Sequence, residues 1–224
     1  MTIPTITHEI ITKGIYLDFE KPIKEETPQI AGVLIDDEYT CYVIDPRLKE
    51  VAEDRRAKRT TERWRYCDAK ELVLSLLDTA EKEDRHIIGY SEAELNTMTD
   101  LVGQEDRISE RYYNANMAPW FKERRKPTYN RIKRVKKKSN EWSKTVGLKD
   151  ILELDFVDYD YPRDLKNYSP ASAIRIMLKF LGEKHHYASV PRGPRKNFTI
   201  LHRYNMHDCK GMRHLLEYRL SRGG

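Results

Sequence analysis

The sequence has little cysteine, little glycine and no long apolar run. Its three cysteines are odd in number and form no C-x-x-C pair, which predicts free thiols in a reducing compartment. No stretch reaches the roughly 18 consecutive apolar residues of a membrane-spanning helix, and the N-terminus lacks the pattern of a secretory signal. These absences predict a cytoplasmic protein with no membrane partner.

Glycine-rich phosphate loops are also missing among the ten glycines of the chain, which argues against a nucleoside triphosphate site. The 224 residues are enough for one large domain that buries roughly 70% of the surface of its unfolded chain. Such a domain needs no disulfide or structural metal. We predict a single domain over residues 1–224, with a basic insertion at about 107–146.

Charge is distributed unevenly along the chain. The net charge is +5, and the segment 122–144 holds eleven Lys or Arg against two Glu. An acidic body with one concentrated basic segment fits a polyanion, because contacts with phosphates release counterions. A solvated helix face is an equally good interpretation of the charge alone. The candidate nucleic-acid-binding residues are Arg131, Lys133, Arg134, Lys136, Lys137 and Lys138.

Hydrophobic patterning predicts an α/β fold with a mixed sheet. Three apolar runs, 14–20, 28–37 and 38–45, are expected to form an antiparallel meander. A helix starting after Asp68, a short strand at 86–90 and a helix at 91–103 follow, which is the alternation that adds parallel strands to a sheet. Residues 46–66 are expected to be a surface excursion.

The second half of the chain is harder to interpret. In 107–146 we expect one helix interrupted at Pro119 and a second after Pro127. A further helix is expected from the cap Ser169 to Gly182, where glycine would end it. Residues 183–197 are expected to be a loop before the last helix, which begins near residue 199.

Two carboxylates interrupt the first apolar run, "GIYLDFE". Residues two apart in a strand point to the same face, so Asp18 and Glu20 share one side and Leu17 and Phe19 the other. Two neighbouring carboxylates repel each other and lose hydration on burial. A divalent cation resolves that conflict, although an exposed strand face is the commoner explanation of an isolated D-x-E pair.

The last helix contains "YNMHDC", in which Tyr204 and Asp208 lie one turn apart on the same face. With the D-x-E strand, this motif resembles the 3′-to-5′ exonucleases of the DEDD superfamily, which have an RNase H-like fold. That family has D-x-E on its first strand, a third acid at the start of a helix in mid-chain, and Y-x-x-x-D or H-x-x-x-x-D on its last helix. Arg203 stands where the histidine branch needs His, so the similarity is to the tyrosine branch.

The third acid is expected after the strand "HIIGY", where Glu92, Glu94 and Asp100 are candidates. We choose Glu94, because "YSEAELNTM" is similar to a Y-x-x-x-E pattern of a bacterial RNase H-like branch that is RecB-like or YprB-like; most DEDD enzymes have Asp there, and Glu92 stays an alternative. "YNMHDC" and "LKNYSPASAIRIMLKFLG" are similar to the same branch. The resemblance covers about 12–104 and 148–220, and excludes the basic segment.

The resemblance implies a metal-dependent nuclease. Two Mg²⁺ or Mn²⁺ ions would be held by Asp18, Glu20, Glu94 and Asp208, with Tyr204 orienting the attacking water. The expected reaction is 3′-to-5′ hydrolysis of single-stranded DNA or RNA. Two alternatives stay open: a nucleic-acid-binding module of the same fold with weak or no activity, and a structure-selective endonuclease.

Overall fold

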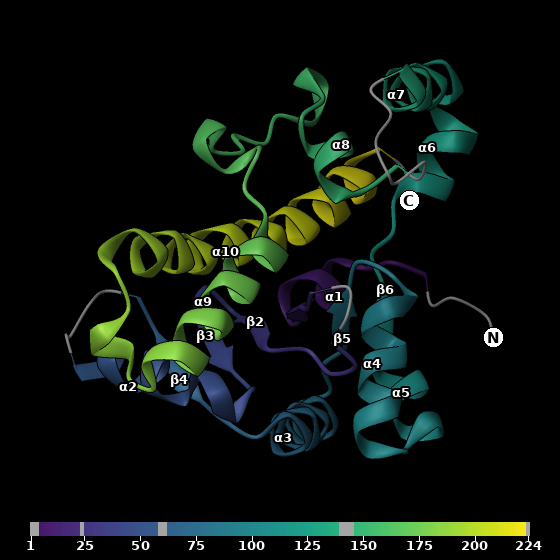
Figure 1. The fold of residues 1–224 in the computed structure, drawn as a ribbon. Helices are drawn as coiled ribbons and strands as arrows, with labels where there is room; N and C mark the ends of the chain where they lie inside the picture. The colour runs from purple at the N-terminus through teal and green to yellow at the C-terminus, as the bar shows by residue number, and fades with distance from the viewer. Residues whose placement is uncertain (1–4, 23–24, 58–61, 139–145, 223–224) are drawn as a thin grey trace.

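A six-stranded mixed sheet is the centre of the fold (Figure 1). The computed structural model describes residues 5–22, 25–57, 62–138 and 146–222. The strand order is β4 (Trp64–Tyr66), β3 (Glu38–Val43), β2 (Ile30–Ile35), β1 (Ile15–Glu20), β5 (Ile87–Gly89) and β6 (Tyr112–Asn114). Strands β1, β2 and β3 form the predicted antiparallel meander, and β5 and β6 continue the sheet in parallel with β1. The α/β class and the mixed sheet are therefore confirmed.

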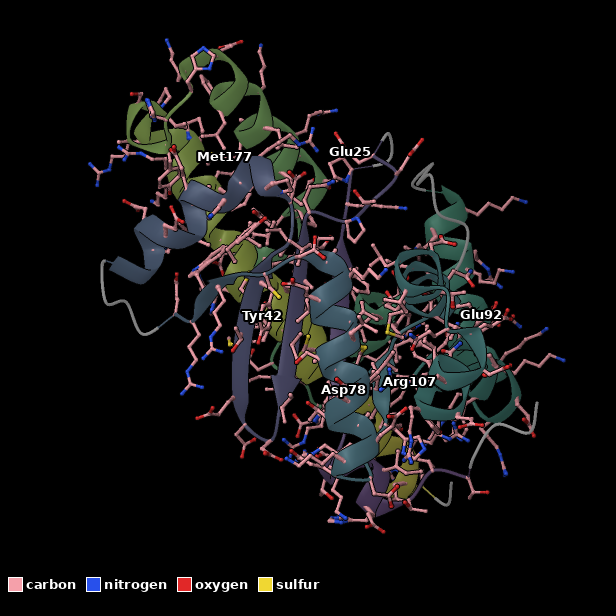
Figure 2. The ribbon with its side chains drawn as sticks, turned by 90° about the horizontal axis from the view of Figure 1, so that it is seen from below. Glu25, Tyr42, Asp78, Glu92, Arg107 and Met177 are labelled. Carbon is pink, nitrogen blue, oxygen red and sulfur yellow. The ribbon has the colours of Figure 1, made fainter. Side chains whose placement is uncertain are left out.

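Helices cover both faces of this sheet. One face carries α1 (His8–Thr12), α9 (Pro170–Lys184) and the long α10 (Arg192–Ser221), and the other carries α3 (Ala69–Lys82), α4 (Glu92–Val102) and α5 (Glu105–Arg111). In Figure 2, α3 crosses in front of the strands and α10 runs behind them. Alternate residues of β1 serve the two cores, with Tyr16 packed toward α10 and Leu17 toward α3.

A third apolar cluster lies against the C-terminal part of α10, beyond the sheet (Figure 1). It contains side chains from α6 (Ala118–Arg124), from α8 (Leu148–Leu152) and from the turns that follow α8, at Asp155–Val157 and Arg163–Leu165. The basic helix α7 (Lys126–Lys138) adds Tyr129 and Ile132 to its edge. Helix α10 thus contributes both to the core between itself and the sheet and to this third cluster.

Residues 46–66 are not only a surface excursion, which corrects the prediction. They contain a 3-10 turn at Pro46–Leu48, helix α2 (Lys49–Ala57) and edge strand β4. The many charges of the segment hid a sparse apolar set, Leu48, Val51, Ala52 and Trp64, each at most 2% exposed. A helix at the rim of a domain needs few apolar residues because only one narrow stripe faces the core.

Proline and glycine misled the prediction at three other places. Pro119 lies in the first turn of α6 rather than interrupting a helix, and Pro194 lies in the first turn of α10, which starts seven residues earlier than expected. The first turn tolerates proline, because its N–H groups have no partner in the helix. Helix α9 continues through Gly182 and ends at His185, whose φ of 63° forms a left-handed cap.

Other local predictions are confirmed. Asp68 caps α3 by accepting hydrogen bonds from two backbone N–H groups, and Ser91 caps α4, which ends at the left-handed Gly103. The three cysteines are free. Among the helices that the structure describes, none is both long enough and apolar enough to cross a bilayer.

Candidate metal centre

Strand β1 presents Asp18 and Glu20 on the face of the sheet that α10 covers. Asp18 lies opposite Gly32 of β2 in the antiparallel register. Leu17, on the other face, is fully buried against the α3 side. The alternation predicted for "GIYLDFE" is confirmed, and the two carboxylates face a helix rather than open solvent.

Helix α10 brings Asp208 to this pair of carboxylates. Carboxylate oxygens of Asp18, Glu20 and Asp208 all lie within 4.8 Å of one another. Asp208 is 7% exposed, whereas the other two keep partial access to solvent. Three carboxylates at this separation offer a metal ion only oxygen ligands. Mg²⁺ and Mn²⁺ prefer such ligands.

Glu94 lies at the margin of the site rather than in the three-carboxylate cluster. It is 8% exposed, and its Oε2 accepts hydrogen bonds from the backbone N (2.9 Å) and Oγ (3.0 Å) of Ser91. This is the capping box at the start of α4. Its charge still acts on Asp18 and Glu20, whereas the alternative, Glu92, is exposed. The structure therefore favours Glu94 over Glu92 as the acid nearest the cluster.

Burial and mutual repulsion make the carboxylates hard to ionise. Burial is the main cause that raises the pKa of Glu20 from 4.5 to about 8 and that of Asp208 from 3.8 to about 6. The pKa of Asp18 is raised well above its ordinary value by burial and then by Glu20, Asp208 and Glu94. A bound cation would relieve both effects, because it supplies opposite charge at the place where hydration is lost.

These shifts predict an unusual pH dependence of stability without divalent cations. The folded protein keeps a proton on Glu20 that the unfolded chain releases, so the free energy of unfolding should fall as pH rises from about 4.5 to about 8. Chemical denaturation in EDTA across this range measures the slope. The Glu20→Gln variant should flatten it, and Mn²⁺ should restore stability at pH 8 in the wild type. A slope that Glu20→Gln leaves unchanged would contradict the assignment.

Asn205 connects the sheet to α10 behind the acids. Its Nδ2 donates to Oδ2 of Asp18 and its Oδ1 accepts from the Tyr39 hydroxyl at 2.9 Å. The amide can approach this closely because Gly32 has no side chain: a Cβ there would lie 1.3 Å from Oδ1 of Asn205. The network fixes the orientation of the Asp18 carboxylate.

A lysine and two tyrosines complete the site on the α8 side. Lys149 Nζ donates to the hydroxyl of Tyr204 and lies 3.7 Å from the centroid of its ring. The Tyr161 hydroxyl donates to Asp208 Oδ1 at 3.1 Å, and Tyr204 lies one helical turn before Asp208 on α10. Burial raises the pKa of Tyr204, which therefore stays protonated at neutral pH.

An open pocket of about 580 Å³ leads from these residues to the basic helix. Tyr204 and Asp208 lie on its wall, with Lys136, Lys149, Lys166 and Asn167. Of the candidate nucleic-acid-binding residues, Arg131, Lys133, Arg134 and Lys137 are exposed on α7, whereas Lys136 pairs with Asp150 of α8 at 2.5 Å. The side chain of Lys138 lies outside the described residues. Helix α7 is thus joined to the helix that carries Lys149.

Sequence reasoning found the acids and Tyr204 but missed their partners. Asn205 stands between Tyr204 and Asp208 in the motif "YNMHDC", so the sequence already placed it next to the predicted site. Tyr161 lies in a tyrosine-rich turn, "DYDYP", that gave no indication of contact with α10. Lys149 stands in "VGLKD", where nothing distinguishes it from a surface lysine. Its place depends on how α8 packs, which local sequence does not reveal.

Comparison with known proteins found no family model, no curated protein and no solved structure that matches the chain.

Proposed function

We propose that the chain is a metal-dependent nuclease of RNase H-like fold that hydrolyses phosphodiester bonds of nucleic acid. The observation that carries the proposal is the convergence of Asp18, Glu20 and Asp208 within 4.8 Å. The three acids come from the first strand and the last long helix, which are the elements the motifs named. Adjacent acids from distant segments favour a bound cation as counter-charge, and hydrolases of phosphate esters use such cations.

The fold supports the RNase H-like part of the proposal. An antiparallel meander of three strands is followed along the chain by helices and two strands parallel to β1. Asp18 and Glu20 lie on the central strand β1, and Glu94 follows the neighbouring strand β5 at the same end of the sheet. Helix α10 packs across β1 and β2 and so brings Asp208 to this end.

The chain's own residues would position the reacting groups. Two divalent cations would activate a water and stabilise the leaving oxygen. The four acids, including Glu94, would hold them. Tyr204 stays protonated, so its hydroxyl would donate to the attacking water or to a phosphate oxygen rather than act as a base. Asn205 would keep the Asp18 carboxylate turned toward the site.

The expected substrate is a single strand of DNA or RNA, degraded from its 3′ end. Incubation of 5′-labelled oligonucleotides with Mn²⁺ tests this, since a 3′-to-5′ exonuclease gives a ladder of shortened products that EDTA prevents. Cleavage of circular single strands would instead indicate the endonuclease alternative. Oligonucleotide binding without metal and without products would indicate the binding module.

The exposed cations of α7 predict a contribution to substrate affinity. Replacing Lys133, Arg134 and Lys137 by Gln should weaken binding of a single-stranded oligonucleotide and flatten its salt dependence, by about 0.7 in log–log slope for each phosphate that is no longer neutralised. Fluorescence anisotropy measures both effects in a series of salt concentrations from about 50 to about 300 mM, where contacts with phosphates weaken.

The matched control for α7 is Lys70, Lys82 and Lys184, three exposed lysines that lie elsewhere on the molecule. Their replacement by Gln removes the same charge and should leave the salt slope nearly unchanged. Equal slopes for the α7 variant, the control and the wild type would reduce α7 to a solvated helix face.

A further inference from the structure

Lys149 lines the same pocket wall as Asp208, a member of the proposed metal centre. Its charge acts on Asp208, Glu20 and Asp18, in that order of strength, and Lys149 is partly exposed. The acids therefore already have one counter-ion from the chain itself. Divalent cations bound to these acids would add positive charge beside Lys149.

The position of Lys149 is well fixed. It lies on α8. The next residue of this helix, Asp150, accepts hydrogen bonds from the backbone N of Gly147 at 2.7 Å and from Lys136 at 2.5 Å. Leu152 of the same helix packs on Gly211 of α10, where a Cβ would come within 2.4 Å of its Cδ1. Gly211 lies one turn beyond Asp208, so this close approach holds α8 beside the acid. The side chain itself is a flexible stem with three N–H donors.

The ammonium group also lines the open pocket between the acids and α7. Two other lysines of that wall, Lys136 and Lys166, are paired with Asp150 at 2.5 Å and Glu153 at 3.3 Å. Lys149 differs because its Nζ donates to the hydroxyl of Tyr204, and the acids that attract its charge are those of the site. Two divalent cations would bring four positive charges to the acids that now attract Lys149, so they would repel the ammonium group from the carboxylates and leave it available to a phosphate.

We infer that Lys149 is a phosphate-binding residue of this site. Its ammonium group neutralises the carboxylates of the metal-free protein and transfers to a phosphate oxygen of the nucleic acid when divalent cations bind. This inference rests on the nuclease function proposed above. Lys149 would contact first the carboxylates and then a phosphate. Removal of its charge should therefore raise the affinity for divalent cations and lower the affinity for nucleic acid.

The test is the Lys149→Met variant, which keeps an unbranched stem and removes the charge. Its affinity for Mn²⁺, measured by calorimetry without nucleic acid, should rise by on the order of tenfold, because a competing positive charge is gone. Its affinity for a labelled single-stranded oligonucleotide in Ca²⁺, measured by anisotropy, should fall by about tenfold, as expected for one charge-assisted hydrogen bond.

Two further variants make the result decisive. Lys149→Arg keeps the charge and should retain both affinities to within about threefold, while Lys179→Met, at an exposed position of α9, should change neither. A fall of both affinities in Lys149→Met would overturn the inference in favour of a purely structural brace, and two unchanged affinities would overturn it as well. Absence of cleavage by the wild type would count against the nuclease function, whereas the two affinities alone decide the role of Lys149.

Discussion

Asp208→Asn is expected to abolish Mn²⁺-dependent degradation of an oligonucleotide, with a loss of at least about 10³-fold, or about 4 kcal/mol of transition-state stabilisation. The substitution keeps the shape of the side chain and removes one of three charges that lie within 4.8 Å. It also weakens the cation site at its most buried member. A time course of product formation with wild-type and variant protein measures the loss.

The fold should survive this substitution. Burial already opposes ionisation of Asp208, so a neutral amide removes an unfavourable charge, and thermal stability in EDTA should stay equal or rise. Asp164→Asn is the matched control, since Asp164 is 59% exposed and pairs with Arg203 on the outer side of α10. That variant should retain full activity. Wild-type activity in Asp208→Asn would refute the metal-centre assignment.

Gly32→Ala is expected to produce the largest loss of stability for the smallest change in the chain. The added Cβ would lie 1.3 Å from Oδ1 and 2.5 Å from Cγ of Asn205, and 2.8 Å from the Tyr39 hydroxyl. Asn205 must then leave its place, which breaks its hydrogen bonds to Tyr39 and Asp18. Overpacking and orphaned polar groups together should cost about 3 kcal/mol or more. Chemical denaturation measures this, and Mn²⁺ affinity should fall in parallel.

Two variants test that explanation of Gly32. Gly182→Ala places the same methyl group in the interior of α9 with no atom within 4 Å, so it should raise stability by about 0.5–1 kcal/mol. Adding Asn205→Ala to Gly32→Ala removes the atoms that clash and should recover part of the stability. If Gly32→Ala proves as stable as Gly182→Ala, the close packing of β2 against α10 is not as described.

Much of the fold could be predicted from local pattern. Apolar runs identified β1, β2 and β3, and the caps Asp68 and Ser91 identified α3 and α4, because in each case the signal lies within a few residues of the structure it causes. Helix α2 and strand β4 were missed because their burial depends on long-range packing of few apolar residues, such as Val51 and Trp64. Pro194 and Gly182 misled the prediction, because the effect of each residue depends on where it lies in its helix. The sequence pattern alone does not give the ends of these helices.

The site divides in the same way. Asp18 and Glu20 are recognisable because two carboxylates in an apolar strand break the pattern of their surroundings. Tyr204 and Asp208 follow from helical spacing. Lys149, in contrast, is ordinary in its local sequence and becomes significant only because α8 packs on Gly211. The buried acid of α4 is the chosen Glu94, and its place in a capping box gives it a second task, which its spacing of three residues from Ser91 could have indicated.

The distance along the chain between the two halves of the site has a consequence for folding. Asn205 and Asp18 are 187 positions apart, and contacts of such separation carry a large loop-closure entropy and tend to form late. The carboxylates therefore come together only when the C-terminal helix docks on a sheet that already exists. A cation held by them would bind the docked state and not its precursor, and would favour docking by mass action. Ion binding would then mark the final step of folding in time, which ion-sensitive fluorescence could follow during refolding.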